Sequence, residues 1–363
     1  MARSNKDNMN RRSFLTRTTA TVGAGLVGNS LLRPTRSSAA LLTPPPLPAA
    51  LEGKSRVSLT RGGTRRKNIT DAMNLLRDEI RAEIGDRQVV IKPNVVRIDP
   101  KIALGMTHPD ALRGVLDFLK PIYNKQVVIA ENCGVGPNDT PKGYQALGYM
   151  PLSEEYNVAL RDLADYGSSA VPMLDPDFRP RGIQISNVMQ DDNVYLISLA
   201  IPKVHSLVGV TLSVKNMAMG APVNGRGEKV KMHEQVMDPN FRKNPRDPNF
   251  NKMFAYNLFQ MAHYTRPSLA VIDAWEGMER LGPTGGDPVP LHAAFAGTDW
   301  IAVDRVATDL MDINFHDIGY LHHCAEGGLG NGDMENIEVV GERVAAVKKP
   351  FKLIANHDEL IVW

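Results

Sequence analysis

The 363-residue chain has only two cysteines, Cys133 and Cys324. They cannot form a disulfide framework or supply four thiolates to an iron–sulfur cluster within one chain. They could pair with each other or remain as two buried free thiols. No run of about 20 uncharged apolar residues occurs, so the sequence predicts no permanent membrane span.

Several catalytic motifs are also missing from the sequence. There is no Walker lysine after a glycine-rich loop, no H-E-x-x-H or C-x-x-C metal spacing, and no G-x-S-x-G elbow. These absences argue against a P-loop nucleotide site, the common zinc motifs and an ordinary serine hydrolase. The composition, with 43% hydrophobic and 23% charged residues, is that of a folded globular protein.

Charge is distributed unevenly along the chain. The formal total is +2, from 42 basic and 40 acidic residues, but residues 1–40 hold seven basic residues and a single acid. The remaining body is therefore mildly acidic. Such a body gives no support for nucleic-acid binding.

The basic leader contains Asn10-Arg11-Arg12-Ser13-Phe14-Leu15-Thr16, followed by a weakly apolar stretch over Thr18–Leu32. Small residues would allow cleavage after Ala39 or Ala40. This order predicts a twin-arginine signal peptide over residues 1–40, the export machinery as partner, and a periplasmic or extracytoplasmic location. Clients of this route fold before export and often carry a metal or organic cofactor. The alternative is a disordered basic tail.

The body is predicted to be one elaborated α/β domain over residues 55–363, after a proline-rich linker at 41–54. Strand Gln88–Ile91, helix His108–Leu119 and strand Gln126–Ala130 have the order of a parallel βαβ unit, with Thr107 as N-cap of that helix. We therefore expect a mixed, largely parallel sheet flanked by helices. Residues 221–250 form a long polar excursion, a lid or binding loop. Further strands are expected at Arg56–Leu59, Gly182–Ile185, Val194–Ala200, Val208–Val214, Ser268–Ile272, Ala293–Ala296, Ile337–Val340 and Phe351–Ile354, and further helices at Ile69–Ile84, Lys252–Tyr264 and Trp300–Met311.

Polar residues follow three of the expected strands. Lys92 and Asn94 come after the first, Glu131 after the second, and Lys215-Asn216 after Val208–Val214. Ligands of open α/β sheets bind beyond the carboxyl ends of the strands. We therefore interpret these residues as one site, while Lys92 in a solvent-exposed turn is the alternative.

A second basic group, Lys203 and His205, shares one face of an extended segment. Convergent lysines would bind a phosphate, carboxylate or sulfate, and they could lower one another's pKa until one acts as a base or nucleophile. An exposed basic loop balancing the acidic body is the other interpretation. The roles assigned are catalytic for His205, Glu131 and Lys215, and substrate-binding for Lys92, Asn94, Lys203, Asn216, Thr284, Gly285 and Gly286.

The last three of these residues belong to the loop Gly282-Pro283-Thr284-Gly285-Gly286, which could turn backbone N–H groups toward an anion. A metal ion is a speculative addition, with His233, Asp273 and Asp304 as ligands.

The motifs of the body occur in a characteristic order. They are Ile91-Lys92-Pro93-Asn94, Thr107-His108-Pro109, Pro202-Lys203-Val204-His205, Thr211 to Asn216 with Gly220, Gly282 to Gly286, and Gly297-Thr298-Asp299 with Ala302-Val303-Asp304. This ordered set resembles the family named domain of unknown function 362, over roughly residues 56–342. The resemblance implies an α/β fold and the same site map, but no particular reaction. The family is associated with iron–sulfur proteins, and some members carry a cysteine-rich ferredoxin segment that this sequence lacks.

Two functions are compatible with these residues. The first is an exported enzyme acting on a small anionic substrate. The second is a non-catalytic binding or redox-accessory protein, with a metal or iron–sulfur centre shared between copies, for example through Cys133.

We predict that changing Arg11-Arg12 to Lys-Lys abolishes export, because the export machinery reads the arginine pair. Cell fractionation followed by immunoblotting, with the unsubstituted chain as control, measures the exported fraction. Unchanged export would show that the leader is not a twin-arginine signal.

Overall fold

A ten-stranded mixed sheet organises the chain in the computed structural model. The structure describes residues 42–48, 53–96, 104–133, 139–175, 177–223, 226–232 and 248–354. The strands of the sheet are β1 (Ser55–Arg61), β2 (Gln88–Lys92), β3 (Val128–Glu131), β4 (Ala159–Asp162), β7 (Val194–Ala200), β8 (Lys203–His205), β9 (Gly209–Thr211), β10 (Leu269–Glu279), β11 (Asp287–Gly297) and β12 (Ile337–Gly341). A separate antiparallel pair consists of β5 (Ser168–Leu174) and β6 (Pro180–Ser186).

The order across the sheet is β12-β1-β11-β10-β7-β2-β3-β4, and β8 joins β10 and β9 off this path. The run from β10 to β4 is parallel, with Gln88 opposite Val194 and Val90 opposite Val128, whereas β11 is antiparallel to both of its neighbours. The predicted mixed, largely parallel α/β fold is therefore confirmed.

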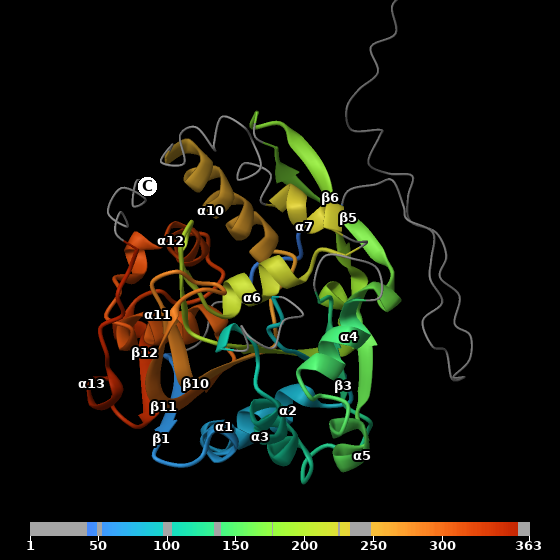
Figure 1. Cartoon of the computed structure of the whole chain (residues 1–363), viewed down its shortest axis with the longest axis vertical. Helices are drawn as coiled ribbons and strands as arrows, with labels where there is room; N and C mark the ends of the chain where they lie inside the picture. The colour runs from blue at the N-terminus through green and yellow to red at the C-terminus, as the bar shows by residue number, and fades with distance from the viewer. Residues whose placement is uncertain are drawn as a thin grey trace, which may run out of the picture. The chain divides into compact units, whose positions relative to one another are not determined.

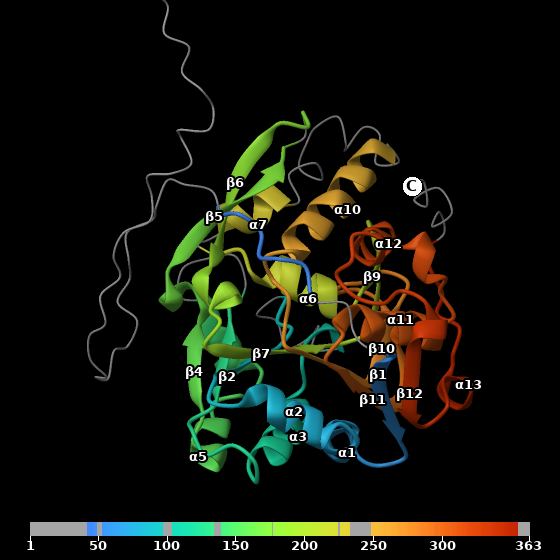
Figure 2. The same cartoon turned by 180° about the vertical axis from the view of Figure 1, so that it is seen from behind.

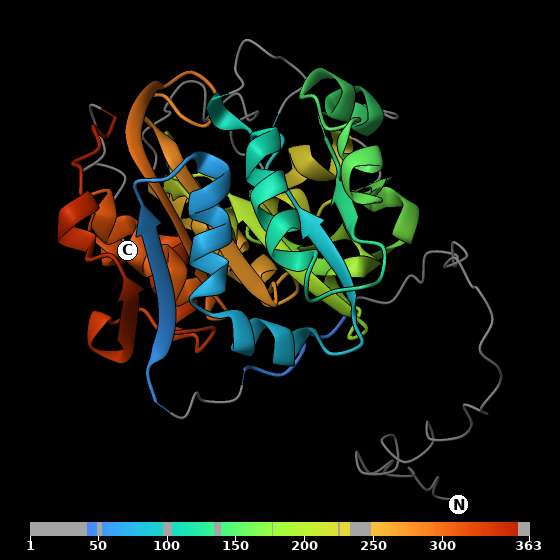
Figure 3. The same ribbon diagram turned by 90° about the horizontal axis from the view of Figure 1, so that it is seen from below.

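Helices cover both faces of this sheet (Figures 1, 2 and 3). The helices are α1 (Arg65–Asn74), α2 (Arg77–Ile84), α3 (Pro109–Leu119), α4 (Asp139–Ala146), α5 (Leu152–Tyr156), α6 (Ser213–Gly220), α7 (Arg226–Met232), α10 (Pro248–Ala262), α11 (Trp300–Leu310), α12 (Gly319–Glu326) and α13 (Val344–Val347). Short 3₁₀ helices lie at Leu163–Tyr166, Asn187–Gln190, Phe315–Asp317 and Met334–Asn336. No described helix is long and apolar enough to cross a membrane.

The two faces have separate apolar cores. Val89 and Ile91 of β2 pack with α1, α2 and α3, while Val90 between them packs on the side of α6, α10 and α11. Both faces of the central strands are thus buried, which explains their continuous apolar sequences. The carboxyl ends of these strands remain the place where polar side chains can gather.

Two predicted elements are wrong at the site itself. The expected strand Val208–Val214 ends at Thr211, and the helix α6 begins at Ser213, so Lys215 lies in the first turn of a helix. The N-cap of α3 is His108, whose Nδ1 accepts from the backbone N–H of Asp110. Thr107 does not cap, because its hydroxyl accepts from the N–H of Asn94 and donates to the carbonyl of Leu199.

Two other predictions also fail. The helix expected over Ile69–Ile84 is divided into α1 and α2, and the turn between them brings Leu76 into the same core as Ile80. Phe351–Ile354 is not a strand; Phe351 is buried and its N–H donates to the carbonyl of Met311. Both cysteines are free and buried.

Helices α1 and α3 approach closely at Gly114, where a Cβ would lie 2.6 Å from the carbonyl oxygen of Arg66 and 2.9 Å from Cβ of Ile69. We predict that Gly114→Ala lowers the free energy of unfolding by about 1–3 kcal/mol, because the helices must separate. Chemical denaturation measures the loss. Arg81→Ala at an exposed position of α2 is the control, expected to stay within about 0.5 kcal/mol. An unchanged Gly114→Ala protein would contradict this packing.

Candidate functional site

Lys92, the last residue of β2, lies inside the protein with 1% of its surface exposed. Its Nζ is 2.6 Å from Oε2 of Glu131 and donates to the carbonyl of Pro93 at 2.9 Å and to Oδ1 of Asn216 at 3.0 Å. The ammonium group therefore has three acceptors around it. The alternative interpretation of Lys92 as a solvent-exposed turn residue is wrong.

Two asparagines connect Lys92 to Lys203. Asn94 Nδ2 donates to Oδ1 of Asn216 at 2.9 Å, and Asn94 Oδ1 accepts from Nζ of Lys203 at 2.6 Å. Lys203 also donates to the carbonyl of Gly105 at 2.7 Å, and Asn216 Nδ2 donates to Oγ of Ser198 at 3.0 Å. The network brings side chains from β2, β7, β8 and α6 into contact.

Helix α6 is held against Lys92 from both ends. At its C-terminal residue, Gly220, a Cβ would lie 2.0 Å from Cε of Lys92, so only glycine leaves room for the lysine. At its first turn, Asp304 of α11 accepts the N–H groups of Ser213 at 2.8 Å and of Val214 at 2.9 Å. This fixed position places Asn216 within the network.

Lys215, beside Asn216 on α6, is 5% exposed, and burial lowers its pKa to about 7. Its Nζ lies 6.0 Å from the ring centroid of Phe254. No described residue accepts a hydrogen bond from this amine or pairs with it. Lys215 thus differs from Lys92 and Lys203, which are held by several acceptors. We call Lys92, Asn94, Glu131, Lys203, Lys215 and Asn216 the lysine–asparagine cluster.

Burial also shifts the pKa of other charged groups in the cluster. The pKa of Lys203 is well below its usual range, first because of burial and then because of Lys215 and Lys92 nearby. The pKa of Glu131 is raised, because desolvation outweighs the attraction of Lys92 and Lys229. Burial therefore disfavours the charged forms of Lys203 and Lys215, and it opposes the charge of Glu131 that Lys92 stabilises.

Three further residues belong near this cluster but were not assigned to the site from sequence. Lys229 of α7 donates to the carbonyl of Asn132, which follows β3, and burial lowers its pKa. Thr211 lies opposite Lys203 in the β8–β9 register. The buried hydroxyls of Thr211 and Ser213 have no hydrogen-bond partner among the described residues. A polar group buried without a partner is unusual, and an absent ligand is one physical explanation.

His205 is two residues beyond Lys203 on β8 and is 3% exposed. Its Nδ1 accepts from the N–H of Leu207 at 3.1 Å, so the neutral ring carries its proton on Nε2. The alternation of β8 places His205 on the same face as Lys203, as predicted. Its catalytic role remains a prediction.

The glycine loop connects the antiparallel strands β10 and β11, and β10 continues to Glu279, well beyond the strand end expected at Ile272. A Cβ at Gly282 would lie 1.8 Å from the carbonyl oxygen of Val204, so the loop packs on β8. Thr284, Gly285 and Gly286 make no described contact with the lysine–asparagine cluster. Their assignment to substrate binding remains a prediction.

The structure gives no support to the speculative metal site. Asp304 caps α6 with both oxygens, and Asp273 pairs with Arg65 at 3.1 Å and accepts from the N–H of Trp275 at 3.2 Å. His233 lies outside the described residues. Among the residues described, no group of three or more histidine, cysteine, aspartate or glutamate side chains could hold a metal ion.

An iron–sulfur centre does not fit the described cysteines. Cys133 is 2% exposed and Cys324 is fully buried, and desolvation raises the pKa of both thiols. Metal ligation requires the thiolate and an accessible sulfur. A cluster shared between copies through Cys133 is therefore disfavoured.

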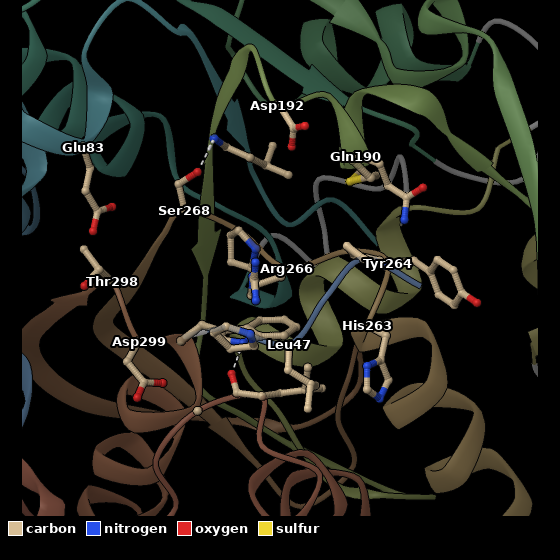
Figure 4. Close-up of a pocket in the computed structure, with 18 of the residues that line it drawn as sticks. Leu47, Glu83, Gln190, Asp192, His263, Tyr264, Arg266, Ser268, Thr298 and Asp299 are labelled. Atoms are coloured by element: carbon tan, nitrogen blue, oxygen red, sulfur yellow. Dashed lines mark hydrogen bonds between the residues drawn. The ribbon is translucent and has the colours of Figure 1, made fainter. Parts of the chain in front are cut away.

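A cavity of about 990 Å³ lies at the amino ends of the parallel strands, at the opposite end from the lysine–asparagine cluster (Figure 4). Its lining includes Val194, the first residue of β7, and Ser268, which precedes β10, whereas Lys203 follows the carboxyl end of β7. No member of the lysine–asparagine cluster lines this cavity. Charged residues of both signs surround it, which gives no preference for an anion or a cation; those labelled are Glu83, Asp192, Arg266 and Asp299.

The fold and the cluster define an α/β protein with buried lysines at the carboxyl ends of its parallel strands. A family model described as Domain of unknown function (DUF362) matches residues 89–309, more than half of the chain. The chain therefore belongs to this family, and the expected resemblance is confirmed. The matched region contains the whole lysine–asparagine cluster.

Two individual proteins show weaker similarity. A protein of Synechocystis sp. named Thylakoid-associated protein is 24% identical over 235 residues, 63% of this chain and 64% of that protein. The chain thus spans less than two thirds of that relative. A crystal structure of a Thermotoga maritima protein has a TM-score of 0.41 and 9% identity, covering 66% of this chain and 57% of the other. A likeness at that level supports no inference about function.

We predict that Glu131→Gln lowers the free energy of unfolding by about 3–5 kcal/mol, because Lys92 loses its counter-charge inside the protein. Denaturant titration measures the change. The double variant Lys92→Met/Glu131→Leu should lose less free energy of unfolding than Glu131→Gln, since no charge is then left unpaired. Asp71→Asn, which breaks an exposed pair with Lys67, is the control and should cost under about 1 kcal/mol. Equal, small losses in all three variants would contradict a buried ion pair.

Proposed function

We propose that the chain is an exported enzyme that acts on a small anionic substrate at the lysine–asparagine cluster. The observation that carries this proposal is the amine of Lys215, which is buried without a hydrogen-bond partner among the described residues. An ordinary structural lysine either reaches solvent or pairs with an acceptor. The side chain of Lys215 is only 5% exposed and its amine has no acceptor among the described residues, so the amine is available to a ligand.

The charge of the cluster favours an anion. Lys92, Lys203 and Lys229 lie near one buried carboxylate, that of Glu131, and Lys215 lies near Lys203. Because burial lowers the pKa of Lys203 and Lys215, an entering anion would be accompanied by proton uptake. Thr211, with its unpaired hydroxyl opposite Lys203, offers a further donor.

In this proposal the side chains divide into two groups. Lys92 pairs with Glu131 and supplies fixed positive potential, Lys203 donates to Asn94 and Gly105, and Asn94 and Asn216 hold the two lysines in place. Lys215 has the freedom and the pKa to exchange a proton near neutral pH. Glu131 and His205 are the other candidates for proton transfer.

The leader supports the exported location. Its arginine pair, weakly apolar stretch and small residues stand in the order of a twin-arginine signal, and the acidic body follows it. Folding before export is compatible with a site assembled from distant parts of the chain, because the finished site would cross the membrane intact.

A binding protein without catalysis is the competing function. The hydrogen bonds that hold Lys92 and Lys203 in place favour it, since a rigid set of donors suffices to hold an anion. A lysine with a pKa of about 7 is not needed for binding alone, which is why we prefer the enzyme.

We predict that phosphate, sulfate or oxalate raises the melting temperature, and that the effect weakens as the pH rises above about 7. The anion prefers the protonated form of Lys215, so affinity should fall about tenfold for each pH unit above its pKa. Thermal unfolding at several pH values measures this. Lys215→Ala should lose the stabilisation, whereas Lys54→Ala, at an exposed lysine, should keep it. If none of these anions stabilises the parent, or if Lys215→Ala responds equally, the anion site is absent.

A further inference from the structure

We propose that Lys215 forms an imine with a carbonyl compound that carries a carboxylate, a 2-oxo acid being the simplest member of this class. The inference rests on the proposed function, because it assigns a substrate class to the same site. The geometry that supports it is the amine of a 5% exposed side chain on the first turn of α6, beside Phe254 and next to the hydrogen-bonded network of Lys92, Asn94, Lys203 and Asn216.

Other nucleophiles near the cluster are poorly suited to attack a substrate. The thiol of Cys133 is buried, and desolvation keeps it protonated. Nδ1 of His205 is occupied by a backbone N–H, and the carboxylate of Glu131 lies against Lys92. Among the described groups, Lys215 combines a nucleophilic atom with the absence of a competing partner.

The remaining lysines are also constrained. Lys92 has Glu131, Asn216 and Pro93 around its Nζ, and Lys203 donates to Asn94 and Gly105. A lysine that donates through several hydrogens must break these bonds before it can attack. Lys215 has no such hydrogen bonds to break.

Burial makes the amine reactive as well as free. With a pKa of about 7, half of Lys215 is neutral at pH 7. A lysine with an ordinary pKa is neutral in roughly one molecule in 2,500 at that pH. The neutral fraction of Lys215 is therefore about a thousandfold higher than that of an ordinary lysine. Enzymes activate lysine for carbonyl chemistry by lowering its pKa in this way.

The neighbouring charges select the second functional group of the substrate. Lys215 is close enough to Lys203 for its charge to lower the pKa of Lys203. A carboxylate beside the carbonyl would relieve this repulsion, and the hydroxyl of Thr211 could donate to it. A neutral ketone would leave the repulsion in place, so the site should discriminate against it.

The step balances without a redox partner. The nitrogen of Lys215 attacks the carbonyl carbon, forming a C–N bond and a carbinolamine. The C–O bond then breaks, the oxygen leaves as water with two hydrogens from the amine, and a C=N bond remains. Uptake of one proton from solvent gives the iminium, whose positive charge pairs with the substrate's carboxylate.

The test is reductive trapping. The full chain is incubated with pyruvate and cyanoborohydride at pH 7, and peptide mass mapping locates the secondary amine. We expect at least about tenfold faster labelling of Lys215 than of exposed Lys54, and little labelling of Lys215 with acetone, which lacks the carboxylate. Lys215→Arg should lose the label, because guanidinium stays protonated, while Lys54→Arg should keep labelling at Lys215.

Thermal unfolding with acetate and oxalate, which have no ketone or aldehyde carbonyl, separates the two proposals. Stabilisation by oxalate without any trapping at Lys215 would overturn the imine and leave the anion site standing. If oxalate gives no stabilisation and Lys215 is not trapped, both the anion site and the imine are overturned. Labelling spread equally over exposed lysines, or retained at the same rate in Lys215→Arg, would also overturn the imine.

Discussion

The buried ion pair of Lys92 and Glu131 is the constraint on which the rest of the site depends. Both groups leave water, and their attraction offsets that loss only if further hydrogen bonds complete the environment of the ammonium. Asn216 supplies one of these bonds, which requires α6 to lie directly over the end of β2. Gly220 and Asp304 meet that requirement at the two ends of the helix, one by leaving space and the other by capping.

The same arrangement explains why Lys215 is unusual. Once Asn216 fixes α6, the neighbouring Lys215 is buried whether or not it has a partner. Its pKa falls because burial disfavours the charged form of the amine. A stable network thus carries one unsatisfied amine at its margin. Strained or unsatisfied groups that a rigid surrounding maintains are typical of sites that bind or transform a ligand.

The family is described as a domain of unknown function, so the chemistry of the site has to be inferred from its residues. The matched region includes every member of the lysine–asparagine cluster, while both cysteines are buried thiols with raised pKa. The described residues therefore fit the proposed anion binding and amine chemistry better than a thiolate-bound metal centre. The cavity at the amino ends of the strands is a separate feature, since the topology places it at the opposite end of these strands from the cluster.

Local patterns in the sequence determined the βαβ order, the mixed parallel sheet and the residue types at the strand ends, because buried strands and amphipathic helices have distinct apolar periods. Lys92, Asn94, Glu131 and Lys203 were found in this way. Only the tertiary structure decided that Lys215 lies in the first turn of a helix, since Asp304 caps that helix at Ser213, 91 positions earlier in the chain. It also decided that His108 rather than Thr107 caps α3 and that Asp273 and Asp304 have separate partners. Such choices depend on contacts between distant segments, which no local pattern contains.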